Sequence, residues 1–138
     1  EAACWVHARR PFFIMADIAE NARRKARGGK PMVISPIGLE MVQRIDALFE
    51  IERTINGQGA DQRLAARRKL SAPLIADLEI WMRQQRARLS RGNDLARALD
   101  YMLKRWPSFT RFLDDGRVCL SNNAAERALR GIAVGRHN

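Results

Sequence analysis

The sequence predicts a mostly α-helical protein with a single short strand. Apolar residues recur at steps of three, four and seven through most of the 138-residue chain, which is the period of amphipathic helices. Glycine, proline and asparagine interrupt this period at a few places, where helices are expected to begin or end. Only residues 117–120, a short run with Val and Leu after a turn signal, are typical of a strand.

The first half of the chain predicts two helices. The first is expected to begin near Pro11, because proline is tolerated in a first helical turn, and to end at residues 28–29, a Gly-Gly pair. The second is expected to follow Ser35, a residue that can cap it, with Pro36 at the first helical position. The Asn-Gly-Gln-Gly run at residues 56–59 ends it.

A third helix is predicted after a basic segment at residues 63–69. The Ser-Ala-Pro run at residues 71–73 has the composition of a helix start, and apolar residues then recur at helical spacing to Leu89. Residues 91–93 end this helix, and Asn93 can cap the next one. The second and third helices together predict a helical hairpin.

The remaining elements are short. Trp106-Pro107 interrupts the helix that Asn93 caps, and residues 108–113 are expected to form a brief helical turn. An Asp-Asp-Gly turn at residues 114–116 leads into the predicted strand. A last helix is expected to open at residues 121–123, Ser-Asn-Asn.

The charge balance favours a polyanionic partner. There are 25 Lys and Arg against 15 Asp and Glu, a net charge of +10, and most of the cations are arginine, whose planar fork suits phosphate. An arginine-rich coding bias on solvated helix faces is the alternative explanation. The basic residues form four clusters: Arg9-Arg10; Arg23, Arg24, Lys25 and Arg27; Arg63, Arg67, Arg68 and Lys69; Arg83, Arg86, Arg88 and Arg91.

Several classes of protein are disfavoured. Two cysteines are too few for a disulfide framework, which fits a reducing compartment. No apolar run approaches the roughly 20 residues of a membrane helix, and no signal peptide opens the chain. A cytoplasmic protein without a membrane partner is therefore expected.

Cys4-x-x-His7 has the spacing of a metal-ligand pair. Structural zinc takes four ligands, and only Cys119 and His137 could complete the set, so a zinc site is disfavoured. The alternative is a buried cysteine with a hydrogen-bonded histidine at a strand-to-helix junction. Because His7 and His137 are the only imidazoles, no Ser/His/Asp arrangement can be argued.

Glu126 has two possible roles. It follows Asn123 by three residues, the spacing of a capping box in which the glutamate bonds back to the cap. Alternatively, a carboxylate on the first turn of a helix can hold a divalent cation for phosphoryl transfer. The spacing alone favours the cap.

Two strings together suggest a family. Cys4-Trp5-Val6-His7-Ala8-Arg9-Arg10 and, far downstream, Ser121-Asn122-Asn123-Ala124-Ala125-Glu126-Arg127-Ala128-Leu129-Arg130 resemble the transposases of the insertion sequence 66 family. Residues 101–106 and 112–116, between these strings, also resemble that family. The similarity covers essentially the whole chain.

The resemblance implies an RNase H-like core in which three acidic residues bind two Mg²⁺ ions, and in which DNA strands are cut and joined. Glu126 matches the third acid and would be both the catalytic residue and the metal ligand of this chain. Cys4 and His7 match a signature near the active site. Arg127 and Arg130 would bind DNA beside the scissile phosphate or in the flanking sequence. The basic clusters add further DNA-binding candidates: Arg9, Arg10, Arg23, Arg24, Lys25 and Arg27.

The implied organisation has three parts: a core segment at residues 1–35, an α-helical insertion at 36–92, and a return to the core at 93–138. The fold class is thus mostly α, with the C-terminal strand–helix remainder of an RNase H-like α/β core. Because the first two acids of the family lie upstream of the Cys-x-x-His string, we expect this chain to be the C-terminal part of the catalytic region. Alone, it is expected neither to hold Mg²⁺ stably nor to cut DNA.

The expected partners are transposon-end and target DNA, together with the remainder of the transposase or a second copy of the chain. Two other hypotheses stay open at this point. One is a non-catalytic basic helical module that binds nucleic acid or protein. The other is a decayed remnant without activity.

Overall fold

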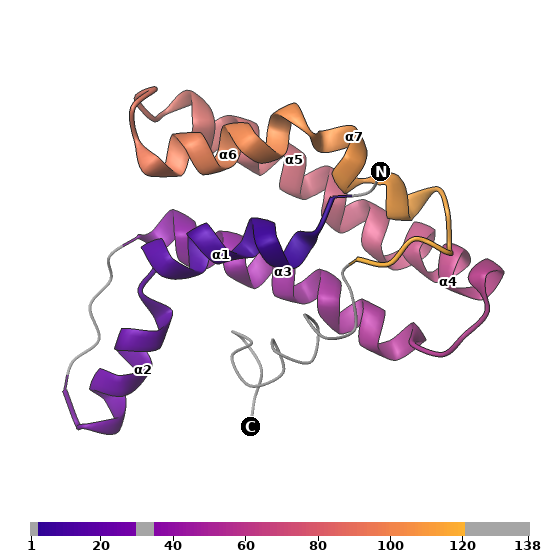
Figure 1. Cartoon of the computed structure of the whole chain (residues 1–138), viewed down its shortest axis with the longest axis horizontal. Coiled ribbons are helices and arrows are strands. Elements are labelled where there is room, and N and C mark those ends of the chain that lie inside the picture. The colour runs from indigo at the N-terminus through magenta and orange to yellow at the C-terminus, as the bar shows by residue number, and fades with distance from the viewer. Residues whose placement is uncertain (1–2, 30–34, 121–138) are drawn as a thin grey trace.

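The computed structural model describes residues 3–29 and 35–120. In this part the chain is mostly helical, which confirms the predicted class, and it contains no strand. Figure 1 shows the long helices stacked side by side and α2 projecting from one end. The elements are α1 (Trp5–Met15), α2 (Ile18–Ala26), α3 (Pro36–Ile55), α4 (Ala60–Ala66), a π-helical turn (Arg67–Ser71), α5 (Ala72–Ala87), α6 (Asp94–Lys104), α7 (Trp106–Phe109) and a 3₁₀ turn (Arg111–Leu113).

The first predicted helix is two helices. α1 begins at Trp5 rather than near Pro11, because Trp5, Ala8 and Phe12 share a buried face that extends the helix toward the N-terminus. The chain then breaks at Asp17, whose φ of 50° is left-handed, and α2 continues from there. Pro11 consequently lies inside α1, not in its first turn.

Two local helix-start predictions are confirmed. The Ser35 hydroxyl accepts a hydrogen bond of 3.0 Å from the Gly38 N–H at the start of α3. The Asn93 side chain accepts one of 2.7 Å from the Leu95 N–H at the start of α6. Each cap satisfies one of the N–H groups that the first helical turn leaves unpaired.

The helix start predicted at residues 71–73 is wrong. The chain is already helical from Ala60, and the π-helical turn joins α4 to α5 without a break. The Ala72 N–H donates to the carbonyl of Arg67, five residues back. Because Pro73 has no N–H to donate, a helix can accommodate it only where the regular bonding changes, and the π turn lies directly before it.

The strand predicted at residues 117–120 is also wrong. These residues form turns and bends after the Asp-Asp-Gly turn, where the Val118 N–H donates 3.1 Å to the Asp115 carbonyl. A strand needs a neighbouring strand for its backbone bonds, and the described residues supply none. The RNase H-like core that the resemblance implies therefore stays a prediction.

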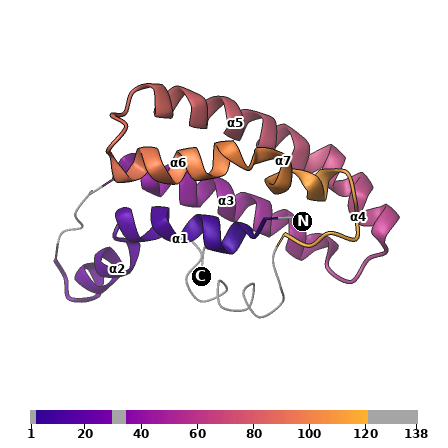
Figure 2. The same cartoon turned by 45° about the horizontal axis from the view of Figure 1, so that its top comes forward.

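One hydrophobic core joins the helices. Trp5 lies within it, edge-on to Phe109 at 5.2 Å, Trp106 at 6.0 Å and Phe112 at 6.2 Å between ring centroids. Its indole N–H donates 3.0 Å to the Phe109 carbonyl. Figure 2 shows α6 lying along α1, in agreement with the contacts between these two helices.

The same core takes side chains from each of the three ranges into which the sequence was divided. The division itself stays a prediction. None of the described helices is both long and apolar enough to span a membrane.

Candidate functional site

Cys4 and His7 stand at the start of α1. Cys4 is the N-cap residue, with extended backbone and a half-buried side chain, and its thiol makes no capping bond. His7 is exposed one turn later, where it lines a small pocket between α1 and α6. Within residues 3–29 and 35–120 no three His, Cys, Asp or Glu side chains come together as a metal site.

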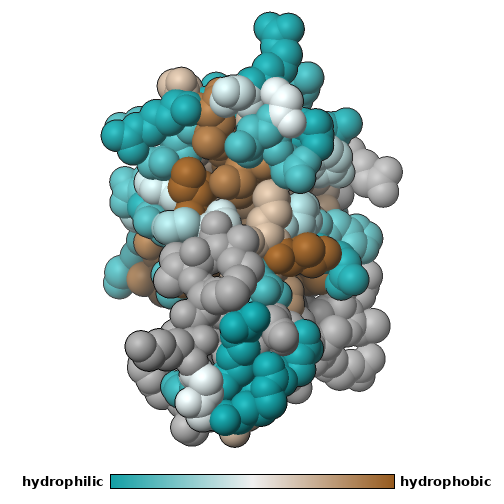
Figure 3. All heavy atoms as spheres, turned by 90° about the vertical axis from the view of Figure 1, so that its left-hand side faces the viewer, coloured by the Kyte–Doolittle hydropathy of each residue, from teal (hydrophilic) through white to brown (hydrophobic). Residues whose placement is uncertain are grey.

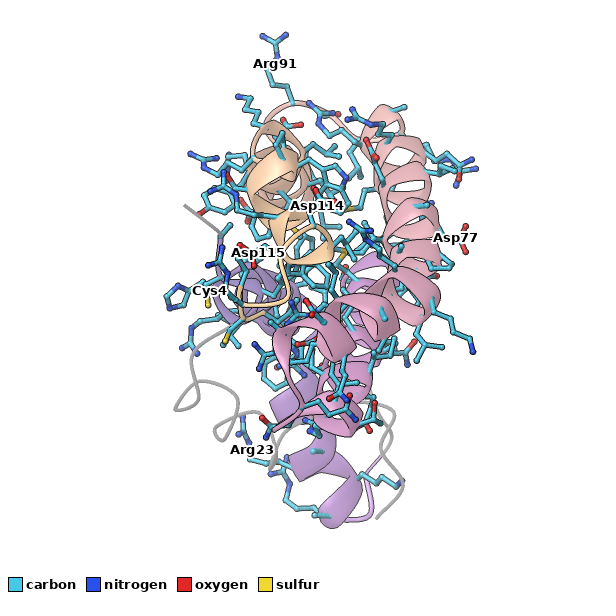
Figure 4. The ribbon with its side chains drawn as sticks, turned by 90° about the vertical axis from the view of Figure 1, so that its right-hand side faces the viewer. Cys4, Arg23, Asp77, Arg91, Asp114 and Asp115 are labelled. Carbon is cyan, nitrogen blue, oxygen red and sulfur yellow. The ribbon has the colours of Figure 1, made fainter. Side chains whose placement is uncertain are left out.

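Backbone bonds tie this motif to the far end of the described chain. The Ala3 N–H donates 3.3 Å to the Ser108 carbonyl, and the Trp5 N–H donates 3.3 Å to the Leu120 carbonyl. Figure 4 shows Cys4 and Asp115 on the same side of the molecule, away from Asp77. The Cys-x-x-His string therefore lies against the segment that leads into the second string.

Three predicted site residues lie outside the described residues: Glu126, Arg127 and Arg130. Glu126 follows Leu120 by six positions in the sequence. Its roles as a cap or as a metal ligand both stay predictions.

Arg9 and Arg10 have opposite environments. Arg9 is only 2% exposed, donates two hydrogen bonds to the Asp46 carboxylate at 2.8 and 3.2 Å, and lies over the Phe13 ring. A side chain so enclosed cannot reach a phosphate, which corrects the expectation that Arg9 contacts DNA. Arg10 is exposed and stays a DNA-binding candidate.

The second predicted basic cluster lies at the C-terminal end of α2. Arg23, Lys25 and Arg27 are exposed, while Arg24 is half-buried with a buried Nε that has no hydrogen-bond partner among the described residues. The cations fill the last turn of α2, where they complement the helix dipole. Figure 3 shows the hydrophilic surface of this projecting helix at the bottom of the molecule.

The third basic cluster is partly internal, which the sequence did not indicate. Arg67 is 1% exposed and donates two hydrogen bonds, of 2.8 and 3.0 Å, to the Glu52 carboxylate. A further nitrogen of Arg67 donates to the carbonyls of Phe112 at 3.1 Å and Asp115 at 3.3 Å. Its guanidinium therefore fastens the loop after α7 to the π turn.

One helical turn earlier, Arg63 donates two bonds of 2.9 and 2.6 Å to the Gly116 carbonyl. Gly116 packs so closely on α4 that a Cβ there would stand 1.9 Å from the Ala60 carbonyl oxygen. The i, i+4 spacing of Arg63 and Arg67, which puts both on one helix face, was the available signal for this shared role.

Two of the four arginines of the fourth cluster are ion-paired. Arg83 pairs with Glu79 at 3.0 Å and Arg86 with Asp100 at 2.8 Å. Arg88 and Arg91 are exposed, and Figure 4 shows Arg91 at the end of the molecule away from Arg23. The surface available for a polyanion is therefore smaller than the arginine count suggests.

The Asp-Asp-Gly turn offers no catalytic carboxylate pair. The Asp115 carboxylate accepts hydrogen bonds from the Arg117 side chain at 3.1 and 3.0 Å and from the Arg117 backbone at 2.9 Å. These bonds hold the pKa of Asp115 at about 2, below its ordinary 3.8. Asp115 is thus committed to the turn, while its neighbour Asp114 is exposed.

Comparison with known proteins identifies relatives. The chain matches the family described as "Transposase IS66 family" over residues 1–138. It is 58% identical, over 137 residues, to "Uncharacterized protein y4hP" of Sinorhizobium fredii. The matched region covers 99% of this chain and 24% of that protein. "Uncharacterized protein y4jD" of the same organism is 35% identical over 118 residues, covering 86% of this chain and 23% of that protein. The chain thus spans about a quarter of the length of these relatives, and no solved structure matches it.

Proposed function

Because the chain belongs to the IS66 family of transposases, we propose that it contributes the C-terminal part of a catalytic region that cuts and joins DNA. Glu126 is proposed as its catalytic carboxylate, with Cys4 and His7 close to the reacting centre. The activity itself is proposed for a longer protein, since the relatives are about four times the length of this chain.

One structural observation supports the proposal beyond family membership. The bond from the Trp5 N–H to the Leu120 carbonyl brings the first string beside the segment that leads into the string with Glu126. Residues 115 positions apart in the sequence meet there, as a shared active site requires.

Magnesium is the proposed cofactor. Two such ions would activate the attacking oxygen and stabilise the leaving oxygen of a phosphodiester. The described residues do not form a site for either ion, so no catalytic step is derived from them. We propose that Glu126 acts with acidic residues from elsewhere in the transposase.

DNA is the proposed partner, contacted along its backbone by α2. Exposed Arg23, Lys25 and Arg27 project from the body on one short helix. Cations in such a position neutralise phosphates without reading bases, so binding should weaken steeply with salt.

The test is strand cleavage by a full-length protein that carries this chain. Glu126→Gln should abolish Mg²⁺-dependent cleavage of transposon-end DNA while DNA binding and melting temperature change little. The matched control is Glu79→Gln, at an exposed carboxylate that pairs on α5. Full cleavage by the Glu126→Gln protein would refute the catalytic assignment.

The rival hypothesis is a non-catalytic basic module. DNA binding by variants of α2, compared with cleavage, distinguishes it from the enzyme. Changing Arg23, Arg24, Lys25 and Arg27 together to Gln should lower DNA affinity about tenfold or more near 100 mM salt and flatten its salt dependence. If cleavage by the full-length protein is absent but this binding persists, the module hypothesis replaces the enzyme.

A further inference from the structure

The pocket between α1 and α6 has a composition that the catalytic proposal does not use. It encloses about 240 Å³ and is lined by His7, Ala8 and Pro11 from α1 and by Ala98 and Tyr101 from α6. Pockets for drug-sized ligands enclose about 300–1,000 Å³. This one therefore suits a single planar ring system rather than a larger molecule.

Tyr101 gives the pocket an accessible aromatic wall. It is 46% exposed, the only aromatic among the large apolar residues exposed in the described ranges. Two neighbours fix the ring: Phe109 meets it edge-on at 6.3 Å, and the Arg105 guanidinium lies over one face of the ring, 4.0 Å from its centroid. Arg105 is itself held by a 3.2 Å bond to the Tyr101 carbonyl, so the ring and the cation form one platform.

The charge at the pocket is positive. Two exposed arginines flank the lining in the sequence: Arg10 comes directly before the lining residue Pro11, and Arg105 is one helical turn after the lining residue Tyr101. Neither pairs with a carboxylate in the described part of the chain, and the described lining contains no acidic residue. This contrasts with Arg83, Arg86 and Arg97, which are all paired.

We propose that this pocket holds an unpaired base of a DNA strand, with the base against Tyr101 and the flanking phosphates near Arg10 and Arg105. An aromatic platform bordered by cations is how proteins bind single strands, because every base has a π-face to stack and every linkage has a negative charge. A paired base has both faces covered by its neighbours and cannot enter. The inference rests on the proposed function, since it takes DNA as the partner.

The site also has a position that suits the proposal. His7 belongs to the Cys-x-x-His string. Trp5 within that string bonds to Leu120, and Ala3 directly before it bonds to Ser108. The pocket therefore includes a residue of the string that the proposed function puts close to the reacting centre. A base held here would fix one strand beside that centre.

The test is binding of a single-stranded oligonucleotide that contains one 2-aminopurine to the 138-residue chain, followed by anisotropy and by quenching. Tyr101→Ala should weaken binding about 5- to 100-fold and relieve the quenching, since stacking on one aromatic has about that effect. Tyr101→Phe keeps the ring and should bind within about twofold of the parent. Arg105→Gln should weaken binding and lower the magnitude of the salt slope by about 1.

Ile80→Ala is the matched control, because Ile80 is similarly exposed on α5, at 58%, outside the pocket. Should Tyr101→Ala unfold the chain, Tyr101→Leu replaces it, keeping apolar volume without a π-face. Unchanged affinity and quenching in a folded Tyr101 variant would overturn the inference, as would equal affinity for an intact duplex. Cleavage that depends on Glu126 is measured separately, so the proposed function can survive this outcome.

Discussion

The basic residues inside the molecule and those on its surface have different tasks. Inside, Arg9 and Arg67 hold buried carboxylates, and Arg67 also holds the loop after α7. On the surface, Arg10 is exposed, as are the α2 cations Arg23, Lys25 and Arg27. The count of 25 Lys and Arg therefore overstates the number of cations that DNA can contact, because an arginine buried in an ion pair does not reach a phosphate.

The largest expected effect comes from removing Arg67. Arg67→Met leaves Glu52 charged and buried, and breaking such a pair costs about 3–5 kcal/mol of unfolding free energy. The double change Arg67→Met with Glu52→Leu should recover part of this loss, although the carbonyls of the loop remain unpaired. Urea unfolding of the three proteins measures the difference. A double variant no more stable than Arg67→Met would show that the buried charge is not the main cost.

Neighbouring arginines give the sharpest contrast. Arg9→Met should cost about 3 kcal/mol, because it strands the buried Asp46 carboxylate. Arg10→Met should change stability by no more than about 0.5 kcal/mol and instead weaken binding of single-stranded DNA. Parallel unfolding and anisotropy measurements check both. If Arg9→Met is as stable as Arg10→Met, the division between interior and surface arginines fails.

Arg63 should give an intermediate effect. Arg63→Met removes two bonds to the Gly116 carbonyl and should cost about 1–2 kcal/mol. Arg68→Met is the control, since its exposed 3.5 Å contact with the Leu113 carbonyl should contribute little. Thermal unfolding compares the pair. Equal losses in both variants would place the stabilisation elsewhere.

The smallest effect is expected from the exposed pair of Asp115 and Arg117. Because the pKa of Asp115 falls from 3.8 to about 2 on folding, its contribution is complete above about pH 4 and is lost as the pH falls toward 2. Arg117→Gln should remove this part of the acid sensitivity. Melting temperatures from pH 5 to pH 2 test it: identical curves for the parent and Arg117→Gln would contradict the pairing.

Local signals in the sequence predicted local structure well. Ser35 and Asn93 cap helices as expected, because a cap needs only the few residues that follow it. Ser71 has a similar sequence context to Ser35, since a proline follows each within two residues. Ser71 nevertheless lies inside a helix, with its hydroxyl buried. What distinguishes them is the chain before each serine, which for Ser71 is already helical from Ala60.

The candidate site was harder to predict, because burial depends on contacts between distant residues. Arg9 is enclosed because α3 brings Asp46 to it, 37 positions away in the sequence. The pair of Arg9 and Asp46 has no pattern within one helix, and for Arg67 the only local signal was its i, i+4 spacing from Arg63. The pocket beside Tyr101 likewise exists only once α6 lies along α1.

The bond between the Trp5 N–H and the Leu120 carbonyl has an architectural consequence. The segment between these two residues is an insertion whose two ends lie together. A host domain can accommodate such an insertion without moving the segments on either side. Such an insertion can be lengthened, shortened or exchanged while the two segments that flank it stay at the same distance from each other. The helices between Trp5 and Leu120 would then form a unit that can vary in length while its two ends stay together.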